Sequence, residues 1–302
     1  MIMDTAQLGH SVRHAHSIVL SSALFSRNYS SCAALSVLIC EYIANFKDEY
    51  TYFWSKGIRA PGSIKWLYLF SRYFPLFAHA VNLGFSTTSL SQLPVDREIC
   101  QTWFYALMGG SYALLVALDI VLMMRVYALY LQDKRVAVMF AVLLVLEGAV
   151  GIVYGSRSIN TMPFNEICEG TSSPTELISF LCCVTLTQTA IWTMTLSKRR
   201  VVPGQPHPLV RLLLRDGTWA WAIICGVFIS QAPYSLSSKI IRVDIGFMWP
   251  TVMLSLAACK IIINMQKLRM KTDSGDFNRG SEIFLTSNIG STRHSVVRPS
   301  SV

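Results

Sequence analysis

The chain has 302 residues, of which 52% are hydrophobic and 14% are charged, and its mean hydropathy is +0.43. Soluble domains carry about 25% charged residues, so this composition excludes an ordinary soluble protein. The formal net charge of +9 raises nucleic acid as a class of partner, and the placement of the basic residues decides against it.

Seven apolar segments follow one another along the chain, each near the roughly 20 residues that a transmembrane helix needs. The first is the shortest and contains Glu41, while Pro233 blurs the end of the sixth. The connections are too short for a second folded domain. The sequence therefore predicts an all-α integral membrane bundle of seven transmembrane helices, with spans at about 30–46, 64–86, 102–124, 136–155, 177–197, 219–238 and 245–266.

Basic residues alternate in number between successive connections. Grouped by side, six lysines and arginines lie on one side of the predicted spans and seventeen on the other. Loops that retain Lys and Arg are cytoplasmic, so we expect the N-terminus outside and the C-terminus inside. The basic excess is then a topology signal with some attraction to anionic lipids, and no nucleic-acid partner is expected.

The two ends of the chain are predicted to lie outside the membrane domain of residues 30–266. We expect residues 1–29 to form a mobile extracellular segment. The tail at 267–302 is polar, rich in Ser and Thr, and predicted to be disordered in the cytoplasm. Three histidines in "GHSVRHAH" have a spacing that can bind a metal on a helix, but a cluster near a terminus is weak evidence, and we predict no metal site and no cofactor.

Two of the eight cysteines differ from the others in position. Cys100 opens the third span, and Cys168 lies in the longest outer loop. Both face the oxidising side of the membrane, where disulfides form and persist. We predict a Cys100–Cys168 bridge that holds the loop over the helices, with two free thiols as the alternative.

Several ionisable residues lie within predicted spans, where they are expensive and are functional candidates by default. The predicted orientation puts two acids and three bases at one level in the cytoplasmic half. Two interpretations remain open: a static polar network that fixes helix register, or a switch that couples the inner ends of the helices. The five residues are Glu41, Arg72, Asp119, Arg125 and Lys260.

The cytoplasmic connections offer candidate contact residues. Tyr50, Phe53 and Trp54 would share one face of a helix, as an interfacial element does. The basic loop at 197–218 adds Arg215 and Asp216. We predict that this cytoplasmic face contacts a partner.

The motifs "EYIANFKDEYTYFWSKG" (41–57) and "FSRYFPLF" (70–77) resemble a family of seven-helix membrane proteins of mushroom-forming fungi, defined by an uncharacterised domain over the first two helices. The resemblance continues through "RVYALY" (125–130), "LLRDGT" (213–218) and "LAACKIIINM" (256–265), and so covers most of the chain. Glu41 and Lys260 depart from the family, which often has Asp and Arg there. The family has no established activity, so the resemblance implies fold and membrane location only.

The overall plan also looks like that of G-protein-coupled receptors, as an analogy of architecture. A cysteine opens the third helix, a partner cysteine follows in the next outer loop, and Arg125 ends the helix. Met124 stands where those receptors usually have an acid, and "WPTVM" in the seventh helix lacks their Asn-Pro-x-x-Tyr motif.

The leading functional hypothesis is a receptor-like sensor in the plasma membrane or another secretory-pathway membrane, with lipids and a cytoplasmic signalling protein as partners and an unidentified ligand. The alternative is an integral-membrane enzyme acting on a lipid or isoprenoid. Against it, the spans contain no paired carboxylates at helical spacing and no Asp-rich diphosphate motif. A transporter would show internal repeats, and none is visible.

Overall fold

The computed structural model describes residues 5–54, 62–88, 95–130, 132–165, 168–171, 174–201, 217–219, 221–227, 229–230, 240–241 and 247–273. Side chains are described from residue 21 onward, except those at 88, 171, 174–175, 177, 198–201, 240–241 and 268–273. The predicted cytoplasmic-face residues Arg215 and Asp216, the end of the sixth predicted span and the tail after Asp273 lie outside this part of the chain.

The described chain is helical, which confirms the all-α fold class. A short two-stranded sheet joins β1 (Gly170–Thr171) antiparallel to β2 (Ile240–Ile241). A shorter apolar helix covers Gly217–Val227. The longer helices are α1 (Thr5–Glu49), which runs directly into the π-helical turn η1 (Tyr50–Trp54), α2 (Gly62–Thr88), α3 (Arg97–Leu129), α4 (Lys134–Thr161), α5 (Pro174–Val201) and α7 (Trp249–Asp273).

Four of the described helical segments are long and apolar enough to cross a membrane, which indicates a membrane protein. The segment at Lys134–Thr161 is the most apolar, with a mean hydropathy of 2.6 over its best window. Helix α2 is not among the four segments, and it contains Lys65, Arg72 and several other polar side chains. The four segments are Ser21–Trp54, Arg97–Leu129, Lys134–Thr161 and Ile178–Ser197.

Helix α1 differs from the expected mobile leader, because its 45 residues form one continuous helix from Thr5. At 1.5 Å per residue it is about 68 Å long, more than twice the hydrocarbon thickness. Its contacts with other helices begin before residue 30, where the first span is predicted to start. The Arg27 guanidinium is buried and lies 4.5 Å from the centre of the Trp103 ring, and Ser86 donates a hydrogen bond to Asn28. A search for apolar runs misses this part because polar side chains make these contacts.

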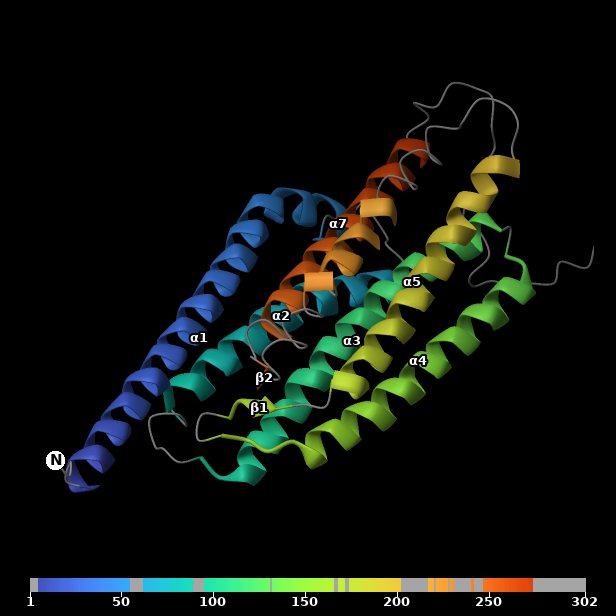
Figure 1. Ribbon diagram of the computed structural model, residues 1–302. Helices are drawn as coiled ribbons and strands as arrows, with labels where there is room; N and C mark the ends of the chain where they lie inside the picture. Colours follow the sequence, from blue (N-terminus) through green and yellow to red (C-terminus); the bar gives the residue numbers. More distant parts are fainter. Residues whose placement is uncertain are drawn as a thin grey trace, which may run out of the picture.

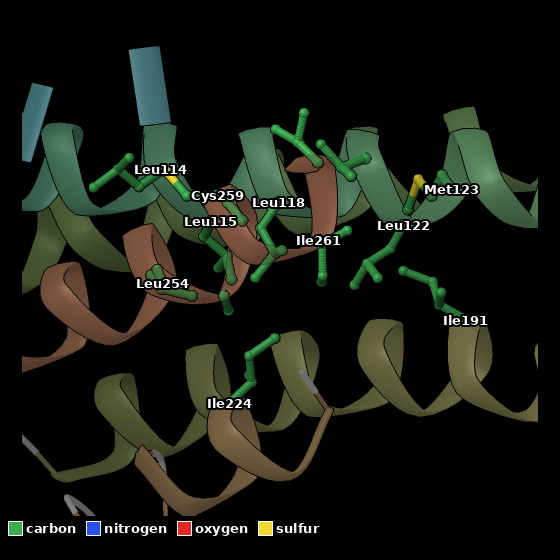
Figure 2. Packing of buried hydrophobic residues seen from close by; sticks show 14 of the residues in the cluster. Leu114, Leu115, Leu118, Leu122, Met123, Ile191, Ile224, Leu254, Cys259 and Ile261 are labelled. Carbon is green, nitrogen blue, oxygen red and sulfur yellow. The ribbon is translucent and has the colours of Figure 1, made fainter. Parts of the chain in front are cut away.

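Helices α3 and α7 are central to the bundle (Figure 1). Helix α3 packs against α2, α4, α5 and α7, while α7 also packs against α1 and α2. Leucines and isoleucines from α3, α5 and α7, together with Ile224, form the main core (Figure 2). The outward faces of α1 and α4 expose large apolar side chains such as Phe46, Val145 and Ile152. An apolar exterior around a buried core fits a lipid surround.

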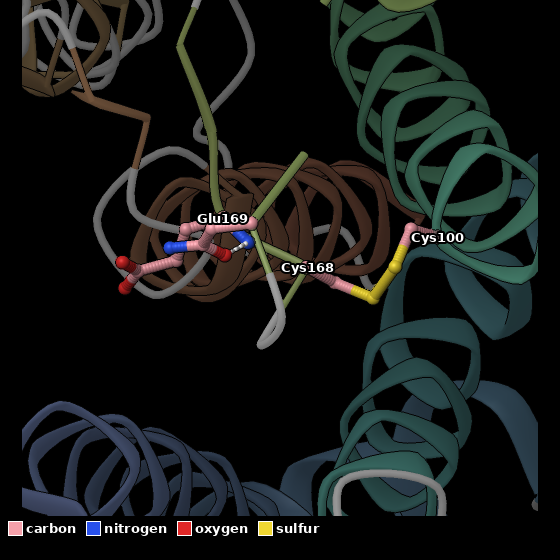
Figure 3. Close-up of a disulfide and its surroundings, with 4 residues drawn as sticks. Cys100, Cys168 and Glu169 are labelled. Atoms are coloured by element: carbon pink, nitrogen blue, oxygen red, sulfur yellow. Dashed lines mark hydrogen bonds between the residues drawn. A yellow bond between two sulfur atoms is a disulfide. The ribbon is translucent and has the colours of Figure 1, made fainter. Parts of the chain in front are cut away.

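The predicted disulfide is confirmed, because Cys100 at the start of α3 is bonded to Cys168 in the segment after α4 (Figure 3). Both cysteines are fully buried, and their Cα atoms are 5.3 Å apart. A tight turn precedes β1, since the Glu169 backbone N–H donates to the Asn165 side chain at 2.7 Å. The bridge therefore holds this segment against α3.

Candidate inner polar site

The end of α1 widens into the π-helical turn η1, at the end of the bundle where α3 also finishes; we call this the inner end. Single π turns inside helices are rare and frequent at functional sites. Here the turn separates three aromatic residues that an α-helix would place on one face. Phe53 is buried, whereas Tyr50 and Trp54 are 61% and 50% exposed. The predicted common face is therefore wrong, because the chain is not α-helical here.

Phe53 fixes the turn to α2. Its ring stacks on the fully buried Tyr68 ring, with centroids 4.1 Å apart and planes 5° from parallel. Stacked aromatic pairs contribute about 0.5–1.5 kcal/mol beyond the area that they bury. The stack brings the last turn of α1 against the part of α2 that contains Arg72.

A buried ion pair joins the two helices at this level. Arg72 Nε lies 2.8 Å from Glu49 Oε2, and the two side chains are 5% and 0% exposed. Glu49 Oε1 accepts hydrogen bonds from the Tyr73 hydroxyl at 3.0 Å and from Trp54 Nε1 at 3.3 Å. Burying a carboxylate requires a paired charge and hydrogen bonds, and both are present.

The guanidinium of Arg72 has further partners on α1. Its Nη2 donates to the Tyr42 carbonyl at 2.8 Å, and its central carbon lies 4.5 Å from the centre of the Tyr42 ring. The planar, multiply donating guanidinium suits this combination of contacts in a way that an ammonium does not. We call Tyr42, Glu49, Tyr68, Arg72 and Tyr73 the Glu49 cluster.

A second, more open ion pair lies at the same corner. Lys267 Nζ on α7 is 2.7 Å from Asp48 Oδ2 on α1, and each side chain is 39% exposed. Lys267 also lies 5.8 Å from the centre of the Tyr52 ring. The inner ends of α1, η1, α2 and α7 are thus joined by one buried and one exposed ion pair.

Arg125 occupies the neighbouring part of the inner end. Its side chain is buried, and Nη2 donates to the carbonyl of Ile261 on α7. It also lines a partly open pocket between α3, α5 and the helix at Gly217–Val227, which we call the inner pocket. The rings of Trp192 and Trp221 stack in the wall of this pocket, with their centroids 4.9 Å apart. The other lining residues are Leu122, Val126, Gln188, Ile191, Thr195, Gly217 and Thr218.

Part of this site lies in a segment that is similar to a known family. Residues 29–77 match the model of a family of unknown function, DUF6533. No curated protein and no solved structure matches the chain. The matched segment, called here the DUF6533 segment, runs from α1 through η1 into α2 and contains every member of the Glu49 cluster.

The five residues predicted to form one network are not brought together. Glu41 is half-buried and accepts a hydrogen bond from Asn45 at 2.6 Å on its own helix. Lys260 projects from the exposed face of α7. Arg72 pairs with Glu49 instead of Glu41, since its guanidinium reaches the last turn of α1. The charges that meet at this level come from a different set of residues.

Asp119 and Arg125 lie on α3 but have separate partners. Asp119 is fully buried and accepts a hydrogen bond from Gln188 on α5, whereas Arg125 reaches the backbone of α7. Each therefore joins α3 to a different helix.

Sequence reasoning missed Glu49 because it ended the first span at residue 46 and treated the next residues as a loop. The available signal was periodicity. Glu49 follows Tyr42 by seven residues, which puts the two on one face of a helix. Arg72 lies within the next predicted span, where a buried base requires an acid as its partner.

The contacts of the Glu49 cluster form a joint between helices α1 and α2. The one fully buried acid of the Glu49 cluster is neutralised by the cluster's only base. Oε1 of Glu49 accepts two hydrogen bonds and Oε2 is held in the ion pair, so neither oxygen is free to act as a general base. Exposed Tyr50 and Trp54 lie beside this joint, where a membrane interface or a partner can reach them.

Proposed function

We propose that this chain is a seven-helix, multi-pass membrane sensor with its N-terminus outside, and that its inner end binds a cytoplasmic partner. The inner pocket supports this proposal most directly. Arg125 lies in the pocket on α3 and holds the backbone of α7, while α5 and the helix at Gly217–Val227 supply the opposite walls. A relative movement of these helices changes the shape of the pocket.

The enzyme alternative is weaker because of where the carboxylates lie. Asp119 and Glu147 are the buried acids in the middle of the bundle, and both side chains are 0% exposed. A general acid or base must come within hydrogen-bonding reach of its substrate. In the part of the chain that the structure describes, these acids are enclosed by helices α3, α4 and α5.

The orientation is tested by accessibility. A tag before Arg13 should be accessible in sealed cells and a C-terminal tag protected, because seventeen of the basic residues fall on one side of the predicted spans. Antibody binding before and after permeabilisation measures both. A protected N-terminal tag would reverse the orientation and place the inner pocket outside.

The partner site is tested by Arg125→Lys. This variant retains the charge but loses the planar guanidinium that reaches Ile261. We expect normal abundance and an altered set of proteins labelled by a proximity-labelling enzyme fused to the C-terminus. Arg125→Ala should change the set further.

Arg135→Lys is the matched control, because Arg135 is exposed at the start of α4 near the same end. It should leave abundance and labelling unchanged. If Arg125→Lys and Arg125→Ala both match the wild type in labelled proteins, Arg125 does not couple the helices to a partner, and the proposal fails.

A further inference from the structure

Helices α1 and α2 present two neighbouring rows of exposed apolar side chains to the outside of the bundle. Successive members are three, four or seven positions apart, so each row lies on one face of its helix. Tyr42 joins the rows, because its ring centre lies 6.0 Å from that of Phe46 on α1 and 5.8 Å from that of Tyr73 on α2. The rows are Ile39, Ile43, Phe46 and Tyr50 on α1 and η1, and Trp66, Tyr73 and Phe77 on α2.

The length of these rows matches one leaflet of a bilayer. Ile39 and Tyr50 are eleven positions apart, or about 16 Å along the helix at 1.5 Å per residue. The hydrocarbon core is about 30 Å thick, so one leaflet supplies about 15 Å of it. Acyl chains can therefore follow the rows from a headgroup level at Tyr50 to Ile39. A cytoplasmic protein cannot reach this depth, which favours a lipid as the occupant.

Amphipathic aromatic residues lie at the headgroup level of the rows. Tyr50 and Trp54 are exposed on η1, and Trp66 near the start of α2 is 74% exposed. Trp and Tyr are enriched where a membrane meets water, because each combines an apolar ring with a polar atom. These three side chains therefore indicate a headgroup region beside η1 and the first turns of α2.

Two lysines lie at the same level. Lys65 Nζ is 4.8 Å from the centre of the Trp54 ring, a cation–π distance that holds the ammonium next to the exposed turn. Lys47 is exposed and precedes Tyr50 by three positions, so it projects from the same side of α1. Among the described residues neither lysine forms an ion pair. Both ammonium groups can therefore bind an anion from outside the chain.

The acids that directly follow Lys47 do not compensate these two charges. Asp48 binds Lys267 of α7 at 2.7 Å, and Glu49 is held by Arg72 of α2 at 2.8 Å. Each acid is thus neutralised by a base from another helix. The surface is left with positive charge beside an apolar face, which is complementary to a phospholipid with a negative headgroup. An ammonium suits such a headgroup because it binds phosphate oxygens as a point charge.

We propose that Lys47 and Lys65 bind the headgroup of an anionic phospholipid whose acyl chains lie along the exposed rows of α1 and α2. Anionic phospholipids are found in the cytoplasmic leaflet, so the choice of leaflet rests on the proposed orientation, whereas the binding itself does not. The whole surface lies within the DUF6533 segment. It is separate from the inner pocket, whose walls come from α3, α5 and the helix at Gly217–Val227.

Trp54 connects the headgroup site to the Glu49 cluster. Lys65 lies over its ring, and its Nε1 donates to Glu49 Oε1 at 3.3 Å. An anion that holds Lys65 in place therefore also holds the exposed turn against the buried ion pair. A ligand that binds only the folded state stabilises that state, so an anionic lipid should raise the midpoint of thermal unfolding.

The experiment uses native mass spectrometry of the full chain in detergent, mixed with equal amounts of dioleoylphosphatidylserine and dioleoylphosphatidylcholine. The two lipids have the same acyl chains, so the ratio of bound lipids reports the headgroup alone. Each lysine near an anionic headgroup contributes about fivefold in affinity, so the wild type should prefer phosphatidylserine by more than that. Lys47→Gln and Lys65→Gln should each reduce the preference about fivefold, and Lys65→Arg should retain it.

Lys134→Gln is the matched control, because Lys134 is exposed at the start of α4 near the same end and its loss removes the same charge. It should leave the preference unchanged. Equal binding of the two lipids by the wild type overturns the proposal, as does an equal loss of preference in Lys134→Gln, which would mean that total charge decides. Lys47→Gln, at an exposed position, gives the same answer if Lys65→Gln does not fold.

Two further measurements separate the possible ligands and the two proposals. Glycerophosphoserine, which lacks acyl chains, should not displace phosphatidylserine at equal concentration; displacement would assign a soluble anion to the site and overturn the lipid. In nanodiscs, phosphatidylserine should raise the unfolding midpoint of the wild type more than that of Lys47→Gln/Lys65→Gln, and an equal rise in both overturns the proposal. A detergent sample has no inner or outer side, so a reversed orientation would refute the proposed sensor without changing these results.

Discussion

The buried Glu49–Arg72 pair makes a quantitative prediction about stability. Arg72→Met removes the guanidinium but keeps an unbranched apolar side chain of similar length, so Glu49 loses its paired charge while remaining 0% exposed. Breaking a buried ion pair in this way costs about 3–5 kcal/mol. Tyr73 and Trp54 still donate to Glu49 Oε1, which favours the lower half of that range.

The exposed Asp48–Lys267 pair supplies a control within the same corner of the protein. Its N–O distance of 2.7 Å is close to the 2.8 Å of the buried pair, but each of its side chains is 39% exposed. Exposed pairs contribute about 0–1 kcal/mol, so Lys267→Met should lower the free energy of unfolding by no more than that. The two substitutions therefore separate the effect of burial from that of geometry.

Unfolding free energies can be measured by titrating micelle-bound protein with SDS and following its helical circular dichroism. The double variant Glu49→Gln/Arg72→Met should be more stable than Arg72→Met alone, because it removes the unpaired charge. Equal losses for Arg72→Met and Lys267→Met, or a further loss in the double variant, would refute the claim that burial makes this pair important.

Two further predictions concern the ends of the bundle. Cys100→Ser and Cys168→Ser should impair surface expression equally, with the double variant no worse than either, since one bond is lost in each case; additive losses measured by cell-surface labelling would contradict this. Phe53→Ala should lower the free energy of unfolding by about 3–5 kcal/mol because Phe53 is buried against Tyr68, whereas Tyr50→Ala at an exposed position should stay within about 0.5 kcal/mol. Similar losses for the two aromatic residues in SDS titration would mean that the π turn does not orient them as described.

Composition and local pattern were sufficient for the helical class and for the disulfide. Long apolar runs predict helices because a membrane-spanning backbone must satisfy its own hydrogen bonds. The disulfide followed from the positions of Cys100 and Cys168 on the oxidising side of the predicted spans. Both predictions depend on information local to a segment, and the sequence contains that information directly.

The partners of the charged residues were not predictable in the same way. Depth along a helix is readable from sequence, but the direction in which a side chain points depends on helix rotation and on local changes of pitch. The π turn at Tyr50–Trp54 moves Phe53 inward and brings Trp54 back to Glu49, which no regular periodicity indicates. The sequence predicts a common depth for five charged residues, but in the structure they have different neighbours. The five are Glu41, Arg72, Asp119, Arg125 and Lys260.

The buried ion pair and the residues around it all lie within the DUF6533 segment. Residues 29–77 contain both partners of the buried ion pair, the π turn that positions them and the tyrosines that surround the guanidinium. Losing one charge leaves the other buried and unpaired, whereas losing both together is tolerable. In other chains that match this segment, an acid aligned with Glu49 should therefore accompany a base aligned with Arg72, and chains without one should lack both. Frequent separation of the two in an alignment would show that the pair does not define the segment.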